Sequence, residues 1–100
     1  MNVRIINAPR PDVVDMIAGR MRADARARLK EERFDSIALV QTTIADLFYY
    51  ADLAQKAAAV FTAELFGSCP NHVTTLAFFG ETSAVRTAAQ AIENDKKSFG

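Results

Sequence analysis

Apolar and polar residues follow one another in blocks that predict short strands and amphipathic helices. Val3 to Ile6 is short and rich in β-branched residues, and the prolines that follow it stop any regular element, which predicts a terminal strand. Ser36 to Gln41 is almost continuously apolar, a pattern typical of a central strand buried on both faces. Two more strands are expected at 60–66 and 73–79, joined by the hairpin loop Gly67 to His72.

Helical spacing of apolar residues marks three further segments. The first runs from an N-cap at Asp12 to about Arg33 and has an apolar stripe at Val13, Ile17, Met21, Ala25 and Leu29. Its second half is so polar that we expect a charged helix at 12–33 that is peripheral and offers a docking surface for a partner. A second helix is expected from the cap Thr43 to Asp46 through Ala59. A third begins near Thr82 and fades by Asn94, leaving a tail at 95–100.

The order of these elements predicts the fold. From residue 36 onward it is strand, helix, strand, strand, helix, which lacks the last strand of the βαββαβ ferredoxin-like pattern. Val3 to Ile6 is the segment that can supply that strand. The sequence therefore predicts one α/β (α+β) domain over residues 1–100, with a circularly permuted ferredoxin-like fold whose last strand has moved to the N-terminus.

Composition narrows the function classes. Twelve Lys and Arg balance twelve Asp and Glu, so there is no basic surplus for nucleic acid or a membrane surface. No apolar run reaches the length of a membrane span, and there is no signal-peptide pattern. The single cysteine, Cys69, cannot form a disulfide within the chain. We therefore expect a cytoplasmic protein with no nucleic-acid or membrane partner.

Four segments together resemble one protein family. Ile37 to Thr42 is similar to its opening strand, with Gln41 in place of the usual Glu, and Asp52 to Ala58 is similar to its Asp-x-x-x-Lys-Ala-Ala helix. Phe79 to Arg86 resembles the start of its last helix, and Arg4 to Pro11 resembles the ending of unpermuted members. On these motifs the chain resembles a bacterial microcompartment shell protein of the BMC-domain family in its permuted form. It is most similar to the GrpU group of glycyl-radical propanediol-type compartments.

The resemblance implies a function for the loop. In the family, hexamers carry a pore loop at the position of Gly67, Ser68, Cys69 and Pro70, and in the GrpU group a pore cysteine is associated with iron-sulfur binding. The resemblance thus implies a homohexamer that tiles into a shell with other shell proteins and encloses enzymes. It also implies a metal role for Cys69, with a 4Fe-4S cluster shared between subunits.

Two interpretations of the loop stay open at the level of sequence. A lone cysteine in one chain is usually an inert, buried thiol, whereas six copies around an axis would supply more thiolates than the four that hold such a cluster. A cluster at that position would either relay electrons or plug the pore. His72 is a possible second-shell partner of a ligand, or a residue that hydrogen-bonds within the loop.

The resemblance also implies edge contacts between hexamers at Lys56 and Arg10, although Lys56 alone would be read as a solvated helix residue. Five aromatic residues are expected in the core or at subunit interfaces: Phe48, Tyr49, Tyr50, Phe78 and Phe79. No phosphate loop or zinc motif is present, and the one nucleophile and base pair on offer, Cys69 and His72, would also need an orienting group and a pocket, so we expect no enzyme. The alternative is a small regulatory module that binds a small molecule at a subunit interface.

Overall fold

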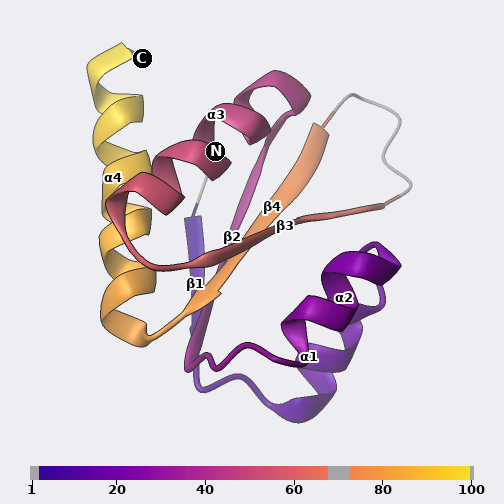
Figure 1. Cartoon of the computed structure of the whole chain (residues 1–100). Helices are drawn as coiled ribbons and strands as arrows, with labels where there is room; N and C mark the ends of the chain where they lie inside the picture. The colour runs from indigo at the N-terminus through magenta and orange to yellow at the C-terminus, as the bar shows by residue number, and fades with distance from the viewer. Residues whose placement is uncertain (1–2, 68–72, 100) are drawn as a thin grey trace.

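A four-stranded sheet with helices on both faces makes up the protein (Figure 1). The structure is a computed structural model that describes residues 3–67 and 73–99. In chain order the elements are β1 (Val3–Asn7), α1 (Pro11–Ala18), α2 (Ala23–Leu29), β2 (Ser36–Thr43), α3 (Ile44–Ala57), β3 (Phe61–Leu65), β4 (Val73–Gly80) and α4 (Thr82–Phe99).

The strands lie in the order β1-β2-β4-β3, and every neighbouring pair is antiparallel. β2 is central, as predicted, and the N-terminal strand β1 pairs along it with Val3 opposite Val40. The strand that the βαββαβ pattern places last therefore precedes the other elements in the chain. This arrangement confirms the circularly permuted ferredoxin-like fold.

One face of the sheet packs against α3 and α4. Alternate residues of β2 and β4, such as Val40 and Phe78, are fully buried there against Leu47 and Tyr50 of α3 and Ile92 of α4. Because side chains alternate across a strand, the residues between them face the other way. The central strands therefore need a cover on both faces, which explains their nearly continuous apolar sequence.

The second face is covered by α1 and α2, which corrects the expectation of a peripheral helix. Ile17, Met21 and Leu29 are buried against a surface formed by Ile37, Phe61, Ala63, Leu65, Ala77 and Phe79. Val13 and Ala25 pack on the same cluster, so every member of the predicted apolar stripe contacts the core. The polar residues of this segment form its outer surface, whereas its apolar stripe covers the second face of the sheet and completes the core on that side.

The prediction of one helix over 12–33 is wrong in a second respect, because the chain folds into two helices. α1 ends at Ala18, Gly19 follows as its C-cap, and Arg22 has an extended backbone as the N-cap of α2. Glycine has a low helix propensity, which favours an end at this point. Arg26 of α2 holds the turn between the two helices, since its guanidinium donates to the backbone oxygens of Ala18 at 3.0 Å and Met21 at 2.9 Å.

The expected tail at 95–100 is also corrected, because α4 continues to Phe99. No glycine or proline lies between Thr82 and Gly100, so the local sequence has no helix breaker before Gly100. The last turns also gain a contact with α3, in which the Tyr49 hydroxyl donates to the Asp95 carboxylate at 2.9 Å. Packing of α4 along α3 thus extends the helix beyond its apolar stripe.

Candidate functional site

The predicted pore loop follows β3 at one end of the sheet. Gly67 is its one described member and is exposed, whereas Ser68, Cys69, Pro70 and His72 lie outside the described residues. The ladder between β3 and β4 ends at the pair Leu65 and Thr75, which brings both ends of the loop to the same edge. The predicted hairpin is therefore confirmed, and the roles of Cys69 and His72 stay predictions.

The turn between α1 and α2 holds the base of this loop. The backbone N–H of Phe66 donates to the oxygen of Arg20 at 2.8 Å, and an Arg20 guanidinium nitrogen, Nη1, donates back to the oxygen of Phe66 at 3.3 Å. A Cβ atom added to Gly67 would lie 3.5 Å from the same Nη1. The contact places an exposed cation beside the first residue of the predicted pore loop. The sequence gives no signal for Arg20, because it is one arginine among many in a charged segment.

A carboxylate lies near the loop on the opposite face of the sheet. The Thr74 hydroxyl donates to Glu64 Oε2 at 2.6 Å, across the last part of the β3–β4 ladder. Glu64 pairs with Leu76, whose side chain belongs to the core under α3 and α4. The two faces therefore differ in charge at this end of the sheet, with Arg20 on the α1/α2 side and Glu64 on the α3/α4 side.

Lys56 lies in the last turn of α3 with its side chain exposed. Its Nζ is 2.7 Å from Asp52 Oδ2, one helical turn earlier, so the Asp-x-x-x-Lys spacing of the motif is an (i, i+4) ion pair. Both side chains are largely solvated, and such a pair adds at most about 0.5 kcal/mol to helix stability. The ammonium group lies at an exposed helix end, where a neighbouring molecule can reach it.

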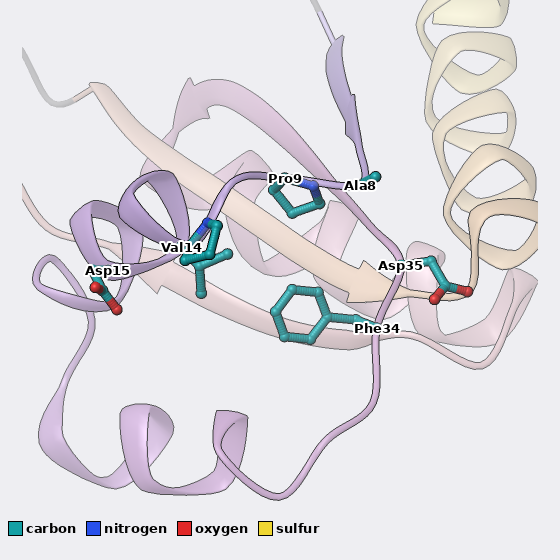
Figure 2. A pocket seen from close by; sticks show the side chains of 7 residues that line it. Ala8, Pro9, Val14, Asp15, Phe34 and Asp35 are labelled. Carbon is teal, nitrogen blue, oxygen red and sulfur yellow. The ribbon is translucent and has the colours of Figure 1, made fainter.

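Arg10 lies between two prolines at the start of α1, beside a shallow pocket of about 470 Å³ (Figure 2). The labelled side chains of Pro9, Val14 and Phe34 form its apolar middle, and Asp15 and Asp35 lie toward its two ends. Arg10 and Lys56 are both cations with donors only, so each needs an acceptor such as a carboxylate or a backbone oxygen as its partner.

Three of the five aromatic residues lie in the core, as expected, and for the two exposed ones the place at a subunit interface stays a prediction. Tyr50, Phe78 and Phe79 are buried. Phe48 is 66% exposed and Tyr49 52% exposed, and both project from the N-terminal half of α3. Ile44, one turn before Phe48, is also exposed. An apolar strip on this helix is therefore left uncovered in the single chain.

Metal ligands do not cluster in the described part of the protein: residues 3–67 and 73–99 contain no group of three His, Cys, Asp or Glu side chains suited to an ion. Nor does any helix in those ranges have the length and apolar character to span a membrane. Because the whole chain has one cysteine, a cluster held by several thiolates would require several copies of it.

No protein-family model and no curated protein matches the chain. Solved structures do match. The ligand-free GrpU microcompartment shell protein from Pectobacterium wasabiae has 42% identity, a TM-score of 0.78, and coverage of 92% of this chain and 99% of its own. The GrpU shell protein from Clostridiales bacterium 1_7_47FAA has 26% identity and a TM-score of 0.71, covering 97% and 93% of the two chains.

A third match concerns the fold alone. A fused permuted hexameric shell protein from the RMM microcompartment has 20% identity and a TM-score of 0.70, covering 96% of this chain and 45% of its own. Taken together, the permuted sheet and these matches define a microcompartment shell protein with the BMC fold. Given 42% identity over nearly the full length of both chains, the protein belongs to the GrpU shell proteins.

Proposed function

We propose that this chain forms homohexamers that tile, with other shell proteins, into the shell of a cytoplasmic microcompartment around its enzymes. The observation that carries the proposal is the likeness to a GrpU shell protein over 92% of the chain. The single domain is a slab with extents of 35 × 33 × 20 Å, a shape suited to a thin wall. Its function is structural and selective rather than catalytic, with the loop that begins at Gly67 lining a pore on the sixfold axis.

The uncovered strip on α3 supports assembly. Exposed large apolar side chains that lie together are a feature of surfaces that bind other proteins. Ile44 and Phe48 form such a pair one turn apart. The neutral net charge also suits a protein whose main partners are copies of itself. Electron micrographs of purified protein should show sixfold particles, and particles without that symmetry would contradict the proposal.

Edge contacts between hexamers are the second part of the proposal, and they use Lys56 and Arg10. Lys56 presents a solvated ammonium group at a helix end, and the pocket beside Arg10 has carboxylates at Asp15 and Asp35 that a neighbour's cation could meet. We expect Lys56→Asp to leave hexamers intact and to abolish extended sheets. Lys30→Asp, at an exposed residue after α2, is the matched control and should leave the sheets unchanged.

The third part of the proposal is an iron-sulfur cluster at the pore, held by Cys69 from several subunits. A 4Fe-4S cluster takes four thiolates, so a hexamer would leave two of its six thiols free and break the symmetry at the axis. When bound, the cluster would supply one-electron chemistry or close the opening. His72, three residues later in the chain, would tune a ligand through a hydrogen bond.

Anaerobic reconstitution with iron and sulfide tests this part. Wild-type protein should gain a visible charge-transfer absorption, and Cys69→Ser should lose it while keeping the hexamer mass. His72→Ala should keep the absorption and shift its reduction potential. An identical band in Cys69→Ser would show that the iron binds elsewhere.

A further inference from the structure

An exposed cation lies beside the first residue of the predicted pore loop. Arg20 lies in the turn between α1 and α2, it is exposed, and its Nη1 is 3.3 Å from the backbone oxygen of Phe66. The reciprocal backbone bond at 2.8 Å holds the turn against the end of β3. The backbone bond thus anchors the turn, and the bond from Nη1 places the guanidinium beside Gly67.

The guanidinium keeps most of its binding capacity. A guanidinium has five N–H donors in a planar fork suited to carboxylate and phosphate, and the Phe66 oxygen takes one of them. Within the described ranges no carboxylate is in ion-pair contact with Arg20, and Asp24 of the same segment pairs with Arg22 at 3.8 Å. Glu64 is bonded to Thr74 on the other face of the sheet. The positive charge on the α1/α2 side is thus not neutralised locally.

We propose that Arg20 makes the pore mouth on the α1/α2 side selective for small anions such as carboxylates and phosphates. The inference rests on the proposed hexamer, in which Gly67 of every subunit borders one opening. Sixfold symmetry then places six guanidinium groups around that opening. Converging charges of one sign raise the local concentration of the opposite ion, and salt screens the effect.

The single cysteine of the chain makes the inference measurable, because it reports the arrival of charged reagents within two residues of Gly67. On hexamers prepared without iron, we would measure the rates of Cys69 modification by an anionic reagent (sulfonatoethyl methanethiosulfonate) and by a cationic one (trimethylammonioethyl methanethiosulfonate). Each rate is divided by that for free cysteine. The ratio of the two cancels any change in the thiol pKa, which affects both reagents alike.

We expect the ratio of the normalised rates, anionic over cationic, to be about three or more at low salt. The ratio should fall toward one at about 0.5 M salt, because salt screens the charge. Arg20→Gln should abolish the preference, and Arg20→Lys, which keeps the charge, should retain most of it. Arg86→Gln removes the same charge from an exposed position on α4, at the other end of the sheet, and should leave the ratio unchanged.

Native mass spectrometry of the same samples separates the two possible failures. A hexamer whose ratio is unaltered by Arg20→Gln overturns the anion preference and leaves the proposed shell function standing. A hexamer in which neither reagent reacts overturns it as well, because no solute then reaches the loop. A mass other than that of a hexamer overturns the proposed function and the inference together.

Discussion

One buried hydroxyl at the start of β2 joins three elements of the fold. Ser36 is fully buried, its Oγ donates to Asn7 Oδ1 of β1 at 2.9 Å, and it lies 2.8 Å from the hydroxyl of Thr82 at the start of α4. The contact ties the displaced N-terminal strand to the central strand and the last helix. From the sequence, Ser36 is predicted only as the first residue of a strand, since its hydrogen-bond partners lie 29 and 46 positions away.

Ser36→Ala should lower the free energy of unfolding by about 1–2 kcal/mol. The substitution removes both hydrogen bonds but creates almost no cavity, and Asn7 and Thr82 are exposed enough to regain water. Urea denaturation would measure the change. Ser83→Ala, at an exposed position one residue beyond Thr82, is the matched control and should change the value by less than about 0.5 kcal/mol. Equal effects of the two substitutions would rule out the network as the cause.

Tyr49 provides a pH-dependent contact between α3 and α4. The hydrogen bond to Asp95, followed by the negative charge of that carboxylate, raises the pKa of Tyr49 above its ordinary value of 10.0. Because the pKa is raised in the folded state, the contact stabilises the fold below pH 10 and is lost as the pH rises through the folded-state pKa. The phenolate cannot donate the hydrogen bond.

Absorbance titration of tyrosine checks this in a Tyr50→Phe background, in which Tyr49 is the one remaining tyrosine. Asp95→Asn should lower the pKa of Tyr49 toward its ordinary value. Asp24→Asn, which neutralises an exposed carboxylate on α2, should leave the pKa of Tyr49 unchanged. A pKa unchanged by Asp95→Asn would show that the hydrogen bond does not form in solution.

At the scale of elements, periodicity predicted the strands and the apolar stripe of the 12–33 segment, but not where that segment packs. Hydrophobic spacing marks the face of a helix that is buried, whereas the high charge of the other face was taken as a sign of distance from the core. The sheet supplies the missing reason, since Phe61 and Phe79 on its second face need a cover. Where the 12–33 segment packs depends on contacts between segments far apart in the chain, and the local sequence pattern does not show those contacts.

Met16 on α1 and Met21 in the turn after it provide a matched test of whether the α1/α2 segment is part of the core. Met21→Ala should lower the free energy of unfolding by about 2–4 kcal/mol, because Met21 is 3% exposed and its truncation leaves a cavity against the sheet. Met16→Ala makes the same chemical change at a residue that is 71% exposed on α1 and should cost less than about 0.5 kcal/mol. Similar losses in the free energy of unfolding from both substitutions would show that the segment is peripheral and not part of the core.

At the scale of the whole molecule, the element order and four loose motifs were enough to predict the fold and the family. Lys56 and Arg10 were found because they belong to those motifs. Arg20 belongs to none, and its position follows from a contact between residues 46 apart in the chain. The chemistry assigned to Cys69 depends on symmetry, because one thiol per chain becomes a ligand set only when several chains converge.

The mass of the protein in solution tests the central claim of a hexameric shell tile most directly. Light scattering coupled to size-exclusion chromatography, at several protein concentrations, gives that mass without labels or reconstitution. Six chains of 11.0 kDa predict about 66 kDa. A stable dimer of about 22 kDa, the assembly expected of a small regulatory module, or a monomer at 11.0 kDa would contradict the account.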